Sequence, residues 1–315
     1  MTTKSNARRR NLVLLRAGDS SIHSCWLEAP GETRNWDLII SYFDDDPNIF
    51  RGGDWLRIDS KGPKLQGLHD FIRDHEELIR QYDYIWLPDE DLQFTCQGIN
   101  HMFAVCRERN LKLAQPSLTH DSYFTHPVTL QSRSFKIRFT AFVEMMAPCF
   151  SVQSLFQVLP TMDGTFSGWG TDFVWSQMLS TDPRSIAIID DIQMRHTRPV
   201  GGGKLYDLVK EMGECAWEEQ LSVEKKHGIR WHRYGIHEGI LHSGRSVKNG
   251  FLVLCIYALD LLRATPRMKL NWRQVPHMFA SAVWQQVKGR RPLEPPEAPP
   301  LLRGSNERSG HQRPV

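Results

Sequence analysis

The sequence predicts an α/β protein in which a mostly parallel sheet is flanked by helices. Segments typical of strands and of helices alternate from residue 11 to residue 190, and this alternation favours parallel strands with helices on both faces of the sheet. Three of the predicted strands run directly into acidic clusters. Because ligands of such sheets bind beyond the carboxyl ends of the strands, these clusters mark the expected site.

The predicted strands are short, apolar and bounded by turn residues. In chain order they are residues 11–16, 36–43, 84–87 and 111–114, a strand ending at 144–148, and residues 185–189. Between the second and third strands, apolar residues from Leu65 to Tyr82 keep a helical spacing. A further helix is expected near residues 99–107, so strands and helices alternate as a parallel sheet requires.

Beyond residue 203 the pattern changes to helices without strands. Helices are predicted at residues 204–226, 246–262 and 275–287. The chain from residue 290 is rich in Pro, Arg and Gly, which predicts disorder. The expected domains are therefore a main domain (11–203), a helical extension (204–289) and a disordered tail (290–315). We expect the extension to pack on the main domain; shaping an acceptor site, forming a dimer interface and lying on a membrane surface stay open.

Composition excludes several classes of protein. The 315 residues are 40% hydrophobic, which is ample for a large core, and a net charge of +3 gives little attraction for nucleic acid. The longest apolar stretch, residues 251–262, is shorter than the roughly 20 residues of a membrane helix. Peripheral membrane contact through basic residues 288–291 stays open. The six cysteines form no CxxC pair, and most of them sit among apolar neighbours, as buried free thiols do. This pattern favours a reducing compartment and a cytoplasmic location, while the even number of cysteines leaves disulfides open.

Asp89 and Asp91 follow the predicted strand 84–87, so both are expected at its carboxyl end. Two carboxylates one residue apart can share Mg²⁺ or Mn²⁺, hard cations that prefer oxygen ligands and commonly bridge to substrate phosphates. Taken alone, such a pair is more typical of a solvated acidic turn. The interpretation as a metal site therefore depends on further residues.

Two later segments supply such residues. Gly168 and Gly170 flank Trp169 in a loop suited to close approach, and Asp172 opens an amphipathic stretch. Asp172 is either the N-cap of a helix or a base that takes a proton from an acceptor hydroxyl. His196 follows the acidic residues 190–191 and is either an ordinary loop histidine or an imidazole ligand of the same metal.

Six motifs occur in this order: residues 16–21 (RAGDSS), 61–64 (KGPK), 82–92 (YDYIWLPDEDL), 143–148 (VEMMAP), 168–172 (GWGTD) and 189–201 (ID…H…P…G). Together they resemble domain-of-unknown-function family 707 over residues 11–205. Their order in turn resembles GT-A glycosyltransferases, especially inverting enzymes with a DxD motif, a later Trp-Gly-x-Asp loop and a downstream histidine. This sequence departs from that pattern at Thr171, where those enzymes commonly carry Glu.

The resemblance implies a GT-A-like fold and a metal-dependent, inverting transfer of a sugar from a UDP- or GDP-linked donor to a hydroxyl of a glycan or small molecule. Mn²⁺ or Mg²⁺ would be held by Asp91, Asp89 and His196 and would neutralise the diphosphate leaving group. Asp172 would be the general base. The donor would lie against Arg16, Ala17, Gly18, Asp19, Lys61, Lys64 and Glu90, and the acceptor against Trp169, Gly170 and Glu144 at the rim.

Two other functions stay open. The chain could bind a sugar or nucleotide-sugar without turnover. It could also be a metal-dependent phosphoesterase, whose second metal would recruit residues 44–46 or Asp190 and Asp191. Residues 44–46 could instead bind the nucleoside, although a solvated turn after a strand explains them as well.

Overall fold

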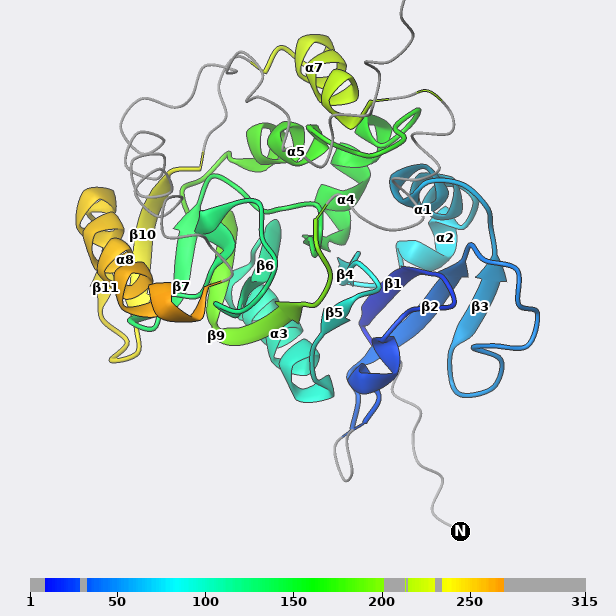
Figure 1. The fold of residues 1–315 in the computed structure, drawn as a ribbon, viewed down its shortest axis with the longest axis horizontal. Coiled ribbons are helices and arrows are strands. Elements are labelled where there is room, and N and C mark those ends of the chain that lie inside the picture. The colour runs from blue at the N-terminus through cyan, green and yellow to red at the C-terminus, as the bar shows by residue number, and fades with distance from the viewer. Residues whose placement is uncertain (1–8, 29–32, 201–212, 214, 230–233, 269–315) are drawn as a thin grey trace, which may run out of the picture.

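The computed structural model describes residues 9–28, 33–200, 213, 215–229 and 234–268. Its centre is an 11-stranded sheet with the order β11-β10-β7-β9-β6-β8-β4-β1-β2-β3, while β5 pairs with β9 off this path (Figure 1). The strands are β1 (Asn11–Ala17), β2 (Trp36–Tyr42), β3 (Leu56–Asp59), β4 (Tyr84–Trp86), β5 (Leu92–Gln93), β6 (Leu113–Leu118), β7 (Phe135–Thr140), β8 (Cys149–Ser151), β9 (Ile186–His196), β10 (Ile236–Leu241) and β11 (Ser246–Val247).

Most strands of this sheet run in one direction. The pairings of β1 with β2 and β4, of β2 with β3, and of β6 with β9 are parallel. Strand β8 runs antiparallel between β4 and β6, so these two also point the same way. Only β7, β8 and β11 oppose the rest of the path within the described residues. The predicted α/β class with a mostly parallel sheet is confirmed.

Helices cover both faces of the sheet. They are α1 (Lys64–Asp74), α2 (Glu76–Ile79), α3 (Cys96–Arg109), α4 (Val152–Val158), α5 (Thr171–Leu179), α7 (Ala216–Lys226) and α8 (Gly250–Ala264). Alternate residues of β1 point to opposite faces: Leu12 and Leu14 join a core with α1, α2, α4 and α5, and Val13 and Leu15 join a core with α3 and α8. In Figure 1, α1 and α5 lie above the sheet and α3 below it.

The prediction of a strand that ends at residues 144–148 is wrong. Strand β7 ends at Thr140, and residues 141–148 form no strand. Conversely, β9 does not stop before its two aspartates but continues to His196. The continuation is possible because the buried guanidinium of Arg138, on the neighbouring β7, pairs with Asp190 and compensates its charge.

The expectation of an extension without strands is also wrong. Helix α7 falls within the predicted segment 204–226, and α8 overlaps the predicted segment 246–262 and continues to Ala264. However, β10 and β11 extend the sheet along the edge of β7. The second predicted helix starts at Gly250 rather than at residue 246, because the side chain of Asn249 caps the amides of Phe251 and Leu252. The predicted helix at 275–287, the tail at 290–315 and most of residues 204–214 lie outside the described residues.

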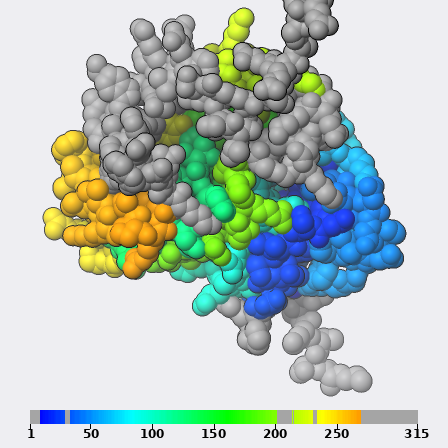
Figure 2. All heavy atoms as spheres, viewed as in Figure 1, coloured from blue at the N-terminus to red at the C-terminus, as the bar shows by residue number. Residues whose placement is uncertain are grey.

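The two ends of the sheet lie far apart. In Figure 2 the first strands (blue) and residues 250–267 (orange) lie at opposite sides of the visible face. Among helices of the described ranges, none combines the length and apolar character needed to cross a bilayer. The carboxyl ends of β1, β4, β6 and β9 meet at one edge between these sides, and this edge carries the residues considered next.

Candidate functional site

A short antiparallel pairing brings Asp91 to His196. After β4, the chain turns into β5, which pairs with the end of β9 in the register that sets Leu92 opposite His196. The Oδ2 atom of Asp91 lies 3.2 Å from Nε2 of His196, and both side chains are buried. The structure thus brings together two of the three predicted metal ligands.

The other ring nitrogen of His196 is hydrogen-bonded to the backbone. Nδ1 lies 2.9 Å from the carbonyl oxygen of Tyr123. A carbonyl only accepts hydrogen bonds, so Nδ1 carries a proton and Nε2 faces Asp91. Burial alone would lower the pKa of His196, but the carboxylates of Asp91 and Asp89 raise it to about 9. In this arrangement His196 is a cation paired with Asp91.

Asp89, the third predicted ligand, is held by a lysine. Its Oδ1 atom accepts a hydrogen bond from Nζ of Lys64, and the same ammonium donates to the carbonyl oxygen of Met145 at 3.0 Å. Lys64 is buried at the first position of α1. Lys64, predicted near the phosphates, therefore lies at the same strand edge as the acidic pair.

Glu144 lies beside this group rather than at an exposed rim, because its side chain is buried. The backbone amide of Glu144 donates to Oε1 of Gln115 at 2.7 Å, whereas its carboxylate atom Oε2 has no hydrogen-bond partner among the described residues. Burial raises the pKa of Glu144 to about 8, and the neighbouring carboxylates of Asp172 and Asp89 add to this rise while His196 opposes it. Glu144 thus shares one electrostatic environment with the predicted catalytic and metal residues.

Asp172 lies in the first turn of α5 and is buried. The N-cap of this helix is Gly170, so the interpretation of Asp172 as the N-cap is wrong. Oδ1 of Asp172 nevertheless accepts the amide proton of Phe173 at 2.9 Å. Gly168 and Gly170 have φ values of +79° and +91°, a left-handed conformation that favours glycine and turns the loop into the helix.

A carboxylate of α7 holds this glycine loop. Glu219 accepts the amide protons of Phe166 and Ser167, each at 2.7 Å, and the hydroxyl proton of Ser167. Helix α7 lies above α5 in Figure 1, and atoms of Gln220 stand 3.2 Å from where a Cβ of Gly170 would be. Sequence reasoning missed Glu219, because a glutamate in the first turn of a helix normally signals only a favourable dipole interaction.

Glu90 and Arg198 fasten the loop that follows β1. Glu90 accepts the amide proton of Gly18 at 2.5 Å and pairs with Arg198 at 3.1 Å, while Arg198 also donates to the carbonyl oxygen of Ser20. Burial raises the pKa of Glu90, and the bonds from Gly18 and Arg198 counteract it. Glu90, predicted to bind donor, thus contacts the predicted donor loop. Arg198 was not predicted, since a single arginine after a strand carries no sequence signal.

The remaining residues predicted to bind the donor sugar-nucleotide lie in two separate regions. The hydroxyl of Tyr42 donates to Asp19, whose own amide donates to Oδ2 of Asp44 at 2.9 Å. Lys61 is exposed and pairs with Asp45 at 2.6 Å. Residues 44–46 therefore interact with the donor loop and with Lys61. Arg16 instead lies buried at the end of β1 beside the start of α1.

Asp190 is not available for the second metal of the phosphoesterase alternative. Asp190 and Arg138 have fully buried side chains and pair at 2.7 Å, and Asp190 also accepts the amide proton of Ser132. A carboxylate held inside the sheet in this way has no room for a cation. The interpretation that recruits Asp190 to a second metal is therefore wrong.

The described residues contain no group of three or more His, Cys, Asp or Glu side chains close enough to hold a metal by themselves. Mg²⁺ in enzymes is often held by one or two carboxylates together with substrate phosphates and water. Oδ2 of Asp91 lies 3.2 Å from Nε2 of His196, and this nitrogen becomes a donor atom for a metal once it gives up its proton. Asp89 lies nearby with Lys64 on its Oδ1. The residues present fit such a cation.

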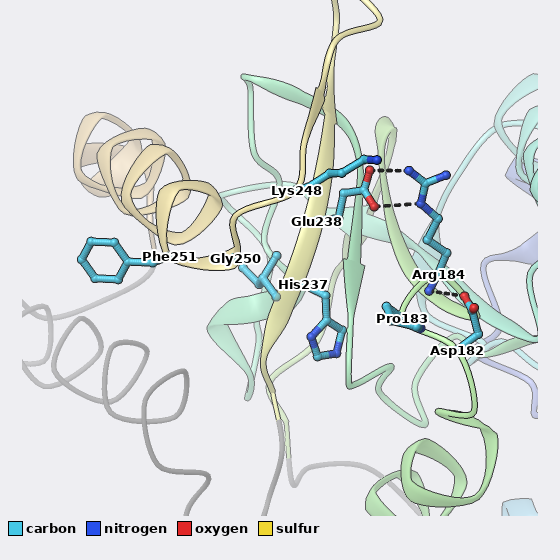
Figure 3. A pocket seen from close by; sticks show the side chains of 9 residues that line it. Asp182, Pro183, Arg184, His237, Glu238, Lys248, Gly250 and Phe251 are labelled. Atoms are coloured by element: carbon cyan, nitrogen blue, oxygen red, sulfur yellow. Dashed lines mark hydrogen bonds and ion pairs between the residues drawn. The ribbon is translucent and has the colours of Figure 1, made fainter.

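A cavity of about 730 Å³ lies elsewhere, at the start of β10 (Figure 3). In its wall Arg184 forms two hydrogen bonds to Glu238, at 2.6 and 2.8 Å, and His237 and Lys248 lie nearby. None of the predicted site residues lines it. The strongest charges of this cavity, on Arg184 and Glu238, already pair with each other. The strand edge therefore remains the candidate site.

Comparison with known proteins agrees with the resemblance of the motifs. The family model "Protein of unknown function (DUF707)" matches residues 71–139, so the predicted resemblance to this family is confirmed over that segment. No curated protein matches.

Solved structures with a similar chain path have little sequence in common with this one. A 1–349 fragment of S. aureus TarS in complex with UDP-GlcNAc is 11% identical, with a TM-score of 0.47, covering 87% of this chain and 79% of that one. A longer S. aureus TarS structure gives 9% identity and 0.44, covering 88% and 43%. A Desulfovibrio desulfuricans G20 protein, provisionally described as a nucleotide-diphospho-sugar transferase, gives 10% and 0.36, covering 70% and 99%. None reaches a TM-score of 0.5, so these likenesses carry no inference about activity.

Proposed function

We propose that this chain is a metal-dependent glycosyltransferase of the GT-A type, moving a sugar from a nucleotide-diphosphate donor to an acceptor hydroxyl with inversion. The observation that carries the proposal is the convergence of Asp91 and His196 at a strand edge where Asp89, Glu144 and Asp172 also lie. A carboxylate–imidazole pair suits a divalent cation, and nearby buried carboxylates suit proton transfer.

Asp91 and Nε2 of His196 would hold Mn²⁺ or Mg²⁺, with Asp89 joining when Lys64 moves from its Oδ1 atom. The cation would act there as a Lewis acid that neutralises the diphosphate leaving group. The proton on Nδ1 of His196 keeps the ring oriented through Tyr123, as partners of histidine ligands commonly do. Metal binding requires His196 to be neutral at Nε2, so it would displace the proton that Asp91 now stabilises.

Asp172 would accept the proton of the attacking hydroxyl. The amide of Phe173 holds the carboxylate of Asp172 at the start of α5. With a pKa of about 8, Glu144 is mostly protonated at neutral pH, so an ionised Asp172 would face a neutral neighbour. Trp169 and Gly170 would contact the acceptor.

The donor would lie between the loop after β1 and the acidic edge. Glu90 and Arg198 hold the residues Ala17–Ser20 in place, and Asp19 and Lys61 border the same side. A UDP- or GDP-linked sugar is the expected donor, and the acceptor is a glycan or a small molecule. The six cysteines are free, which supports a cytoplasmic location.

The test is nucleotide-dependent stabilisation. The melting temperature is measured with UDP and with GDP, each with Mn²⁺ and with a chelator. A ligand at about 100 times its Kd adds roughly 2.7 kcal/mol to stability, which is readily measured. One nucleotide should stabilise the protein substantially more with Mn²⁺ than with a chelator. Asp91→Asn should abolish this metal-dependent difference, while Asp74→Asn, at an exposed side chain at the end of α1, should keep it. A chain that no nucleotide stabilises under either condition would refute the proposal.

A further inference from the structure

The buried arginine at the end of β1 has no opposite charge. Arg16 is 3% exposed; its Nη1 donates to the hydroxyl of Ser41 at 2.8 Å and its Nη2 to the carbonyl oxygen of Gly62 at 2.6 Å. Its Nε atom is buried without a hydrogen-bond partner. No carboxylate in the described part of the chain forms an ion pair with it. Burial without such a partner lowers the pKa of Arg16 to about 10.

Arg138, another buried arginine to compare with Arg16, is paired with a carboxylate. Its guanidinium is fully buried, pairs with Asp190 through two nitrogens, and donates to two backbone carbonyl oxygens. Buried charges in proteins are normally paired in this way, because an unpaired one loses its hydration without replacement. Arg16 therefore lacks the negative partner that its burial calls for.

The guanidinium of Arg16 lies against the first turn of α1. A Cβ added to Gly67 would stand 2.7 Å from Cζ of Arg16 and 3.0 Å from Nε, so a larger residue at this position would displace the guanidinium. Helix α1 has 11 residues and begins after Pro63 without a side-chain cap. The structure records no acceptor among the described residues for the amides of residues 64–66. An uncapped helix start carries a partial positive charge, so two positive groups adjoin here.

We propose that this place binds a phosphate group, whose oxygens accept the amide protons of residues 64–66 while Arg16 supplies the opposing charge. Resting on the proposed function, the ligand is the diphosphate of the nucleotide donor. Arg16 holds the carbonyl of Gly62 and thereby positions the turn that leads into the helix. Helix starts bind phosphates through such amides, and a nearby buried cation strengthens the interaction.

The position relative to the acidic edge fits a diphosphate. Lys64 is the first residue of α1, and its ammonium reaches Asp89 and the carbonyl of Met145. The start of α1 is therefore joined directly to the predicted metal ligands by one side chain. A ligand with two phosphates can engage both places, whereas a single phosphate engages one of them.

The experiment uses inorganic pyrophosphate in the presence of a chelator, with the full chain. Pyrophosphate should raise the melting temperature without metal, and hydrogen exchange should slow at the amides of residues 64–66. Arg16→Lys keeps the charge but loses the planar guanidinium, and should weaken pyrophosphate about 10- to 100-fold. The matched control is Arg57→Lys, a buried arginine that pairs with Asp59 and should leave pyrophosphate binding unchanged.

Hydrogen exchange in the unmodified protein keeps the test decisive if Arg16→Lys does not fold. Protection of residues 64–66 supports the site, and its absence overturns it. Loss of the pyrophosphate effect in Asp91→Asn but not in Arg16→Lys would also overturn it, since the anion would then bind at the acidic edge.

The inference and the proposed function can fail separately. If pyrophosphate protects the start of α1 but neither UDP nor GDP binds, the phosphate site stands and the transferase proposal fails. If a nucleotide binds only with metal and pyrophosphate alone has no effect, the transferase proposal stands and the phosphate site is refuted. Equal protection by orthophosphate would assign the site to free phosphate rather than to the donor, and would overturn the diphosphate assignment.

Discussion

Nε2 of His196 lies 3.2 Å from Oδ2 of Asp91 because β5 pairs with the last residues of β9. The two residues are 105 positions apart in the chain, and a pairing of only two residues on β5 sets their distance. The same strand edge carries Asp89 and Lys64. A cation site here therefore depends on this short antiparallel pairing as much as on the ligands themselves.

Replacing His196 tests whether this pair binds a cation. His196→Asn removes the imidazole ligand and leaves an amide beside Asp91, which binds a divalent cation more weakly. Metal-dependent nucleotide binding should therefore weaken about 10- to 100-fold. The measurement is a calorimetric titration of nucleotide with Mn²⁺. His101→Asn is the control, because His101 is half exposed on α3 and lies 3.7 Å from Asp191 rather than beside Asp91. Unchanged affinity in His196→Asn would contradict the assignment.

Glu144 should make the stability of the protein fall as pH rises. Its folded pKa of about 8 exceeds its ordinary value of 4.5, so its contribution is complete below pH 4.5 and is lost as pH rises through 8. Glu144→Gln keeps a neutral side chain at every pH. The variant should gain about 3–5 kcal/mol relative to the unmodified protein between about pH 5 and about pH 9.

Urea unfolding at both pH values measures this difference. Glu77→Gln, at an exposed position of α2, should show no such change with pH and serves as the control. A Glu144→Gln variant whose stability difference stays constant across this range would show that Glu144 is ionised throughout.

Local sequence patterns correctly predicted those strands whose conformation depends mainly on their own residues. Strands β1, β2 and β4 are apolar runs bounded by turn residues, and burial on both sides of the sheet follows from that pattern. Strand β10 escaped prediction because His237, Glu238 and Gly239 interrupt its apolar residues. Its conformation is set by pairing with β7, a partner about a hundred residues earlier that no local pattern reveals.

The candidate site divides in the same way. Asp89, Asp91 and Asp172 follow recognisable motifs, and the structure gathers them near His196 and Glu144. Arg198 and Glu219 were missed because each acts on a loop far away in sequence, through Glu90 and through the amide of Ser167. A lone charged residue looks like part of a solvated surface until its distant partner is known.

Breaking the buried ion pair of Arg138 and Asp190 should lower the free energy of unfolding. Asp190→Asn leaves a fully buried guanidinium without its counter-charge and should cost about 3–5 kcal/mol in the free energy of unfolding. Urea unfolding checks this value. Asp70→Asn removes an exposed ion pair with Arg73 and should cost less than about 1 kcal/mol. Similar costs for both changes would mean that the buried charge is compensated elsewhere.

Glu219 should restrain the glycine loop without contacting the reacting groups. Its carboxylate accepts two amide protons and one hydroxyl proton from residues 166–167. Glu219→Gln replaces the charged acceptor by an amide with a single oxygen, so at least one of these donors loses its partner, at a cost of about 1–3 kcal/mol. Hydrogen exchange of residues 166–172 should accelerate by roughly 5- to 150-fold if opening of this loop is local.

Glu218→Gln is the matched control, since Glu218 is exposed one position earlier on α7 and no hydrogen bond to the loop is recorded for it. Exchange of residues 166–172 should be unchanged in this variant. In Glu219→Gln, metal-dependent nucleotide binding should also stay unchanged, because the loop faces the acceptor side in the proposed function. Faster exchange together with a loss of nucleotide affinity would instead place the glycine loop in the donor site, and the division of donor and acceptor residues would have to be redrawn.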